Sequence, residues 1–215
     1  MIQFANTCID DFFNNPDAVR EYADGLAYHV DQDGRFPGQR SGELHRIDSD
    51  FYNFTCEKYL RNFYTGEQMK SMAFRALAYF QKIKGDYGSG WVHNDVPYLH
   101  TTIIYLTPDA SPSEGTSLFI PNKLILAAKN SDAKRKFFKG EIDVKDMEKH
   151  RLESGKDFTE TMRFANVYNR CIGFDSSQWH CANSLDRGER LTLIIFWLEI
   201  IGPQTGLQRI KMGVL

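Results

Sequence analysis

Four short runs of β-branched and aromatic residues, separated by turn residues, constrain the fold of this chain more than any other feature. Such runs are typical of β-strands. Because a parallel sheet would need a helix between successive strands, the pattern predicts an antiparallel barrel or jelly roll, mainly β with flanking helices. The runs are HTTIIYL (100–106), TSLFI (116–120), NVYNRCIGF (166–174) and RLTLIIFWLEI (190–200).

The first half of the chain carries helix signals. Asn15 followed by Pro16 is typical of a helix N-cap and first helical position. Apolar spacing predicts a second amphipathic helix over residues 52–63, which ends before Gly66. Residues 30–47 are rich in glycine and charge without a sustained period, so a loop is predicted there.

Residues 72–83, MAFRALAYFQKI, fit either a helix or an alternating strand, and we favour the strand. A chain of 215 residues is long enough for one domain with a sizeable core. We therefore expect a single domain over residues 1–215, with helical and strand support from 1–90 and the β core in 91–200. A polar insertion over 122–164 interrupts this core.

The insertion differs in composition from the strands around it. It holds eleven Lys or Arg and eight Asp or Glu, and the segments NSDAKRKFF and DVKDMEKHRLE resemble short polar helices. Two interpretations stay open, a lid or substrate platform at one end of the barrel, and a solvated excursion with no role in binding.

The composition disfavours several classes of protein. Hydrophobic residues make up 42% of the chain and charged residues 25%, as in ordinary globular proteins. The net charge of -2, without a polybasic run, makes nucleic acid or a membrane surface an unlikely partner, so a small molecule or a peptide is expected. With no apolar run of about 20 residues and no signal-peptide pattern, we expect no membrane association and a cytoplasmic protein. The four scattered cysteines are expected to be reduced and mostly buried. Oligomeric state leaves no sequence signal.

Three side chains form a candidate metal site. His93 and Asp95 are two positions apart, and in an extended segment both side chains point to the same face. His180 lies between two predicted strands, from which it can return to the first pair. Two imidazoles and one carboxylate leave three positions open on an octahedral ion, which suits iron(II) with a chelating co-substrate and oxygen. A structural zinc site would close its shell with four protein ligands.

Arg190 begins the last predicted strand, with Thr192 beside it on the same face. A guanidinium near a barrel interior needs an anion, and its fork matches a carboxylate through two hydrogen bonds. A dicarboxylate ligand would supply that group. The alternative is a surface ion pair with Glu189 or Asp186.

These residues carry a resemblance to a known family. HND at 93–95, the distal His180, and Arg190 followed by Thr192 resemble the HxD…H…RxS/T signature of the iron(II) and 2-oxoglutarate-dependent dioxygenases, in particular the prolyl 4-hydroxylase-like branch. The segment YLTPDASPSEGT at 105–116 resembles the Tyr-Leu-Asn and Gly-Gly-x-Thr elements of that branch. Here Thr107 stands in place of the Asn, and Glu114-Gly115 in place of Gly-Gly.

The resemblance covers residues 91–200 and implies a double-stranded β-helix, the jelly-roll core that cupins share. It implies iron(II), 2-oxoglutarate and O2 as cofactor and co-substrates. Arg190 would bind the distal carboxylate of 2-oxoglutarate, with help from Tyr105 and Thr192. The implied iron ligands, which are also the catalytic residues, are His93, Asp95 and His180.

The expected activity is hydroxylation of a C–H bond in a peptide or small molecule, with release of succinate and CO2. Substrate choice would fall to loop 30–47, Trp91, Tyr98 and the insertion. Two alternatives stay open: a cupin-type metal barrel that does not use 2-oxoglutarate, and a catalytically silent binding module on the same fold. A nucleic-acid demethylase is disfavoured by the near-neutral charge.

The other histidines receive plainer interpretations. His100 is expected in the barrel wall rather than as a metal ligand, and His150 is expected to be solvated. His29 and His45 flank the glycine-rich loop, from which they can reach the pocket entrance.

Overall fold

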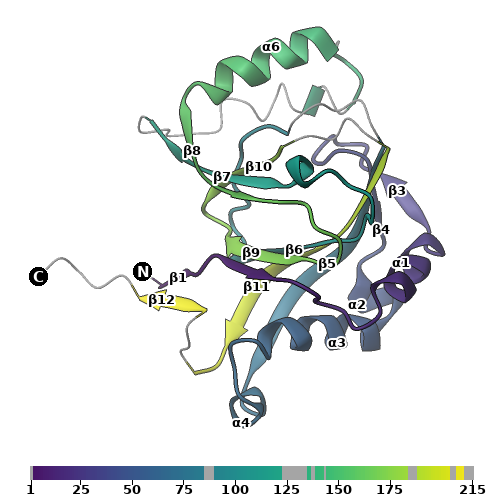
Figure 1. Ribbon diagram of the computed structural model, residues 1–215, viewed down its shortest axis with the longest axis vertical. Helices are drawn as coiled ribbons and strands as arrows, with labels where there is room; N and C mark the ends of the chain where they lie inside the picture. The colour runs from purple at the N-terminus through teal and green to yellow at the C-terminus, as the bar shows by residue number, and fades with distance from the viewer. Residues whose placement is uncertain are drawn as a thin grey trace, which may run out of the picture.

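Two antiparallel β-sheets enclose the interior of the protein, as Figure 1 shows. The larger sheet has seven strands in the order β2-β9-β6-β11-β5-β4-β3, and the smaller has three in the order β10-β7-β8. Strands β1 and β12 form a separate pair. The structure is a computed structural model, and it describes residues 2–84, 90–122, 135–136, 139–142, 144–183, 188–203 and 207–210.

The strands have the following bounds. The larger sheet consists of β2 (Thr7–Ile9), β3 (Tyr28–Val30), β4 (Gln39–Ser41), β5 (Ala73–Lys84), β6 (His100–Tyr105), β9 (Cys171–Asp175) and β11 (Glu189–Ile201). The smaller sheet consists of β7 (Thr116–Pro121), β8 (Phe158–Phe164) and β10 (Trp179–Ala182). The remaining pair is β1 (Ile2–Phe4) with β12 (Gln208–Ile210).

Helices cover the outer face of the larger sheet (Figure 1). The predicted cap is confirmed, because the Asn15 side chain accepts a hydrogen bond from the Ala18 amide at 3.1 Å and Pro16 begins α1. The second predicted helix is α3, and Gly66 does not follow its end directly but begins α4. The helical elements are α1 (Pro16–Asp24), α2 (Leu44–Ile47), α3 (Ser49–Leu60), α4 (Gly66–Met69), α6 (Val144–Gly155) and the short 3-10 helix η1 (Pro112–Glu114).

Successive side chains of the central strands point alternately into two buried clusters, one on each face of the larger sheet. On the outer face, Ala76 and Phe80 of β5 and Trp197 of β11 are buried against the helices. Residues of the opposite parity face the smaller sheet, because successive side chains of a strand point to opposite faces. Between the sheets lies a second buried cluster of Tyr105, Leu118, Phe164, Ile172 and Phe174. This double-sheet core is the predicted jelly roll.

The predicted strands at 100–106, 116–120 and 190–200 are confirmed as β6, β7 and β11, and residues 72–83 form a strand as favoured. The run at 166–174 is strand only from Cys171 onward. Strand β10 was not predicted as a separate element.

Residues 158–164, which we had assigned to the insertion, form β8 and pair with β7. Most side chains of β8 are exposed on both faces, so the strand lacks the apolar alternation that marks half-buried strands. The prediction of a loop over residues 30–47 is incomplete, because this segment contains β4 and α2.

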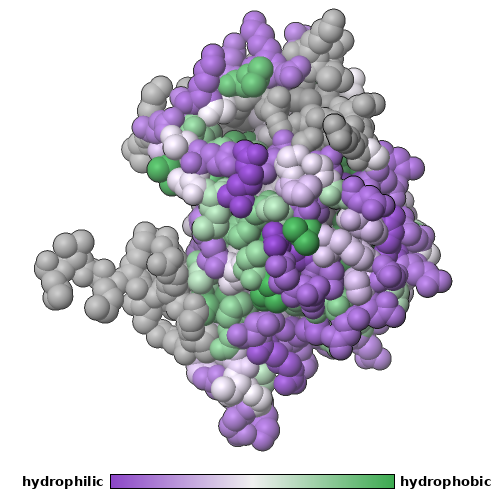
Figure 2. All heavy atoms as spheres, viewed as in Figure 1, coloured by the Kyte–Doolittle hydropathy of each residue, from purple (hydrophilic) through white to green (hydrophobic). Residues whose placement is uncertain are grey.

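The helix predicted from DVKDMEKHRLE is α6. It carries the exposed charged residues Asp146, Glu148, Lys149 and Glu153, and Figure 2 shows a largely hydrophilic surface over this helix. The segment NSDAKRKFF lies mostly outside the described residues.

Cys56, Cys171 and Cys181 are buried and Cys8 is exposed, and none of the four forms a disulfide. Within the described part of the chain, no helix has the length and hydropathy to cross a membrane.

Candidate metal centre

The backbone brings His93 and His180 together. His180 lies on β10, and the segment before β6 runs antiparallel to this strand. The His93 amide donates to the His180 carbonyl at 2.9 Å, and the His180 amide donates to the His93 carbonyl at 2.7 Å. This reciprocal pair places the two imidazole centroids 4.3 Å apart. His93 and His180, which are 87 positions apart in the sequence, therefore lie side by side on two antiparallel segments.

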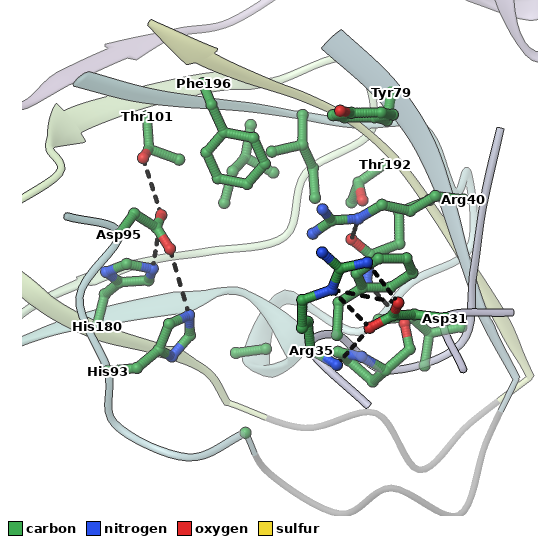
Figure 3. Close-up of a pocket in the computed structure, with 18 of the residues that line it drawn as sticks. Asp31, Arg35, Arg40, Tyr79, His93, Asp95, Thr101, His180, Thr192 and Phe196 are labelled. Carbon is green, nitrogen blue, oxygen red and sulfur yellow. Dashed lines mark hydrogen bonds and ion pairs between the residues drawn. The ribbon is translucent and has the colours of Figure 1, made fainter. Parts of the chain in front are cut away.

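Asp95 completes the predicted triad (Figure 3). Its amide donates to the Ser176 carbonyl at 2.8 Å, which fixes the start of its side chain. Its Oδ2 lies 3.2 Å from His180 Nε2, and its Oδ1 lies 3.6 Å from His93 Nε2. The three possible ligand atoms lie within 4.8 Å of one another. The structure thus brings the three residues into one cluster.

The outer nitrogens of both rings face carbonyl oxygens. His93 Nδ1 lies 2.8 Å from the Trp91 carbonyl, and His180 Nδ1 lies 3.0 Å from the Gln178 carbonyl. Since a carbonyl can only accept, each Nδ1 is the protonated nitrogen, and a neutral ring then presents a lone pair at Nε2. Two lone pairs and a carboxylate that face one another are suited to hold a cation between them. Such backing of ligand histidines is the usual arrangement in metal sites.

The electrostatics of Asp95 agree with this arrangement. Burial alone would raise the pKa of its carboxyl group, but His180, His93 and the hydroxyl of Thr101 hold that pKa well below its ordinary value. Thr101 Oγ1 donates to Asp95 Oδ2 at 2.8 Å. The carboxylate is therefore ionised throughout the neutral range, as a metal ligand must be.

Arg190 lies on the inner face of β11. Its Cζ is 5.4 Å from the centroid of the Tyr105 ring, and its Nε is buried without a hydrogen-bond partner among the described residues. Burial lowers the pKa of this guanidinium. Glu189, one of the two surface partners considered above, pairs instead with Lys84 at 3.6 Å. The other, Asp186, lies outside the described residues.

Thr192 and Tyr105 are directly opposite each other on β11 and β6, so they share the inner face with Arg190. Both are buried. The Tyr105 hydroxyl donates to Thr116 Oγ1 at 2.8 Å, which directs the phenol toward the smaller sheet.

The two departures from the family pattern have structural roles. Thr107 Oγ1 accepts a hydrogen bond from the Leu191 amide at 2.9 Å and so fixes the chain next to Arg190. Gly115 lies against Phe164, where a Cβ would overlap the carbonyl oxygen. The second glycine of the usual pair is therefore kept for a steric reason, whereas its neighbour Glu114 closes a capping box with Ser111.

A cavity of about 850 Å³ connects the candidate metal ligands with Arg190. The metal triad, Arg190 and Thr192 all line it, and so do the predicted positioning residues Trp91 and Tyr98. Its apolar wall includes Ile103, Ile194 and Phe196. Three further lining residues were missed by the sequence analysis: Arg40, Gln81 and Thr101.

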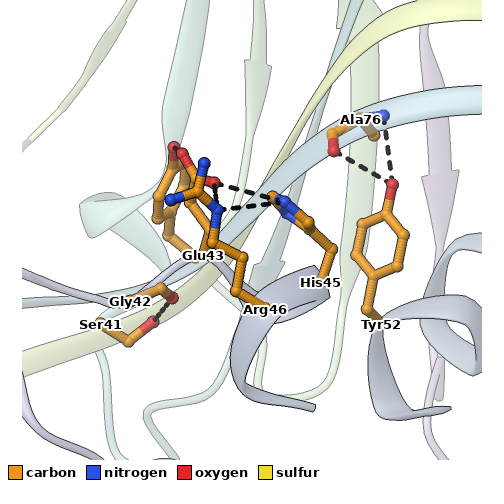
Figure 4. A network of polar contacts seen from close by, with 8 residues as sticks. Ser41, Gly42, Glu43, His45, Arg46, Tyr52 and Ala76 are labelled. Atoms are coloured by element: carbon orange, nitrogen blue, oxygen red, sulfur yellow. Dashed lines mark hydrogen bonds and ion pairs between the residues drawn. The ribbon is translucent and has the colours of Figure 1, made fainter. Parts of the chain in front are cut away.

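The remaining histidines with described side chains lie outside the candidate metal cluster. His29 lines the cavity, but His45 does not, because it packs against Tyr52 and lies 3.4 Å from Glu43 (Figure 4). His100 is fully buried and bonds to the Tyr59 hydroxyl at 2.5 Å, so it is a wall residue as expected. The side chain of His150 lies outside the described ones. From the insertion, Arg135 lines the cavity.

The chain belongs to a family described as "Family of unknown function (DUF6445)", whose model matches residues 5–192. A comparison with curated proteins gave no match.

Solved structures define the class of fold. HygX from Streptomyces hygroscopicus, with nickel, 2-oxoglutarate and hygromycin B bound, is similar with a TM-score of 0.58 and 11% identity, over 91% of this chain and 83% of HygX. A prolyl-4-hydroxylase from Pseudomonas putida is similar with a TM-score of 0.50 and 12% identity, over 91% of this chain and 92% of that one. The fold is that of the prolyl 4-hydroxylase-like 2-oxoglutarate and iron(II) oxygenases.

Proposed function

We propose that residues 1–215 form a single iron(II)- and 2-oxoglutarate-dependent dioxygenase that hydroxylates a C–H bond of a peptide or small-molecule substrate. The observation that carries this proposal is the cluster of His93, Asp95 and His180, whose ligand atoms lie within 4.8 Å of one another on the wall of a cavity. Two imidazoles and one carboxylate with an open side are the donor set of non-haem iron oxygenases.

The residues of the site fit the metal and the co-substrate. His93 and His180 would bind iron through Nε2, since each Nδ1 is engaged with a carbonyl oxygen. Iron(II), when bound, would supply the oxidative decarboxylation of 2-oxoglutarate by O2 to succinate and CO2, in which one oxygen atom enters succinate and the other enters a C–H bond of the substrate.

Arg190 would bind the far carboxylate of 2-oxoglutarate. An enclosed guanidinium remains cationic at neutral pH, because its ordinary pKa lies far above that range, and its Nε has no partner among the described residues. Thr192 and Tyr105 stand beside it on the inner face. The Thr192 hydroxyl can donate to the same oxygen atoms, and the Tyr105 hydroxyl can do so when its proton turns away from Thr116. HygX, which shares the fold, has 2-oxoglutarate bound in its structure.

The cavity wall would protect the reaction from water. Ile103, Ile194 and Phe196 give it an apolar surface. A dry site strengthens electrostatic interactions and limits side reactions. Trp91 and Tyr98 line the same cavity and are the residues that we expect to position the substrate, together with loop 30–47.

An anaerobic titration tests this proposal. Iron(II) and 2-oxoglutarate added to the protein without O2 should give the weak visible charge-transfer band of the chelate, and admission of O2 should then give succinate. His180→Ala should lose both signals. His45→Ala is the matched control, since His45 lies outside the cavity and should leave both signals intact. Equal behaviour of wild type and His180→Ala would show that the metal assignment is wrong.

The same assay separates the alternatives. A cupin-type barrel would bind iron, and Arg190→Ala would leave its activity intact. A catalytically silent module would bind iron without forming succinate. Our proposal requires that Arg190→Ala weakens the band and the succinate yield together.

A further inference from the structure

A second enclosed cation, Arg40, lines the cavity that holds the triad. The register of β4 with β5 places Arg40 opposite Gln81. Arg40 Nε donates to Gln81 Oε1 at 3.0 Å, and Gln81 Nε2 donates to the Pro37 carbonyl at 2.8 Å. The guanidinium is thus held by one edge, and neither terminal nitrogen has a hydrogen-bond partner among the described residues.

Three aromatic rings lie close to this guanidinium. Its Cζ lies 3.9 Å from the centroid of the Phe36 ring, 5.4 Å from that of Phe196 and 5.5 Å from that of Tyr79. Contacts between a cation and ring faces are attractive but satisfy none of the N–H groups of the guanidinium. Burial lowers the pKa of Arg40 to about 10, so the group is still charged at neutral pH. An enclosed charge whose free donor edge faces the cavity is a favourable place for an anion.

The charges of the site leave Arg40 without a counterion. Arg35 is paired with Asp31 at 2.9 Å, and Arg40 forms no ion pair with any carboxylate in the described part of the chain. Asp95 does reach Arg40 electrostatically, but in the proposed complex its charge is balanced by the metal. If 2-oxoglutarate binds as proposed, its near carboxylate and Asp95 balance iron(II), and its far carboxylate balances Arg190. Arg40 is then the enclosed cation that remains.

We propose that Arg40 binds an oxyanion of the substrate, a carboxylate or a phosphate group, and so directs the adjoining apolar part of the substrate past Phe196 toward the metal triad. Figure 3 shows the triad on one side of the cavity and Arg40 on the other, with Phe196 on the wall between them. Phe196 is itself held by a stacked Tyr98 at 4.8 Å. This inference rests on the proposed function, which it extends to the class of substrate.

Calorimetric titration with simple probes tests the proposal. The protein is loaded with Mn(II) and saturating 2-oxoglutarate, a complex that does not turn over, and is titrated with phenylacetate, phenyl phosphate and the neutral phenylacetamide. At least one anion should bind about tenfold or more tightly than the amide, because a charge-assisted pair is lost in the amide. The tighter of the two anions identifies the oxyanion as carboxylate or phosphate.

Two substitutions assign that binding to Arg40. Arg40→Met keeps the apolar contact with Phe36 but removes the charge, and it should weaken anion binding about tenfold or more. Arg40→Lys keeps the charge without the fork, and it should retain part of the affinity. Arg35→Gln is the matched control: Arg35 lines the same cavity but is neutralised by Asp31, so its loss should change the affinity by less than about threefold.

A reciprocal pair of variants distinguishes the role of Arg40 from that of Arg190. Arg190→Gln should lose the anaerobic iron and 2-oxoglutarate band while the metal-loaded protein still binds the anion probe. Arg40→Met should show the reverse. Loss of the band in Arg40→Met alone would make Arg40 the anchor of 2-oxoglutarate and overturn the inference.

Three further results would also overturn the inference: equal binding of amide and anion, no binding of any probe, or unchanged anion affinity in Arg40→Met. If Arg40→Met does not fold, Arg40→Lys and the comparison of anion with amide in the wild type decide the question. If the wild type binds neither iron nor 2-oxoglutarate, the proposed function is refuted instead. Titration of the metal-free protein with the anion probes would then still measure whether Arg40 binds them.

Discussion

Thr101 holds the carboxylate of Asp95 from the inner face of β6. Its hydroxyl proton goes to Asp95 Oδ2, so its 2.8 Å contact with Ser176 is a hydrogen bond that Ser176 donates. This short chain of hydroxyls orients the carboxylate that we propose as a metal ligand. Groups of this kind commonly contribute as much as an order of magnitude or more to metal affinity.

Thr101→Val should therefore weaken Mn(II) binding by about 10- to 100-fold, because the shape of the side chain is kept while the hydrogen bond is lost. Paramagnetic resonance of free Mn(II) measures the affinity. Thr102→Val is the control from the same strand, since Thr102 bonds to the Trp197 indole on the other face. The control should unfold more easily but bind Mn(II) as the wild type does, and a loss of affinity there would refute the assignment.

His100 gives a pH dependence of stability. Burial lowers its pKa from the ordinary 6.5 to about 3, so between these values the unfolded chain binds a proton that the folded chain does not. The free energy of unfolding should then fall as the pH is lowered from 6.5, by about 2 kcal/mol at pH 5 from this residue. Urea unfolding at pH 7 and pH 5 measures the fall. His100→Gln should show a smaller difference between the two pH values, and an equal difference would contradict the prediction.

At the scale of elements, the turn from η1 into β7 depends on close contact with the end of β8. Gly115→Ala would drive a Cβ into the Phe164 carbonyl, and backbone cannot move aside there without disturbing the pairing of Thr116 with Phe164. We expect a loss of about 2 kcal/mol or more in the free energy of unfolding. Gly66→Ala, where nothing lies within 4 Å of the new Cβ, should be nearly neutral in the same urea titration. A neutral Gly115→Ala would show that β7 and β8 can part at this point.

Elements with strong alternation or caps could be predicted from the sequence, and so could the triad. Asn15 and the β11 run carry local signals that tertiary contacts do not override. The strand β8 could not be found, because both of its faces are mostly exposed and its pairing with β7 is a long-range contact. Arg40 was missed for a related reason: it lies in a three-residue strand within a glycine-rich loop, and only the register with β5 shows where it points.

At the scale of the whole molecule, the candidate metal site joins the two sheets. His180 belongs to the smaller sheet, whereas Asp95 is tied through Thr101 to the larger one. A metal ion that binds all three ligands would therefore stabilise the native packing of the sheets against each other. Ligands that bind only the folded state raise its stability in proportion to the logarithm of their concentration.

Addition of Mn(II) at about 100 times its Kd should raise the free energy of unfolding by about 2.7 kcal/mol, and a chelator should reverse the gain. Thermal unfolding with and without the metal measures the effect. His180→Ala should show no increase. A metal-induced increase of equal size in that variant would place the ion elsewhere.

The reciprocal amide and carbonyl bonds between His93 and His180 use only main-chain atoms. These two bonds, which hold the positions of the two proposed ligands, do not depend on which side chains stand there. An engineer can exchange either imidazole for another donor, such as a carboxylate or a thiol, and keep the attachment points in place. The scaffold is thus suited to retuning which ion it prefers by redesign of single residues.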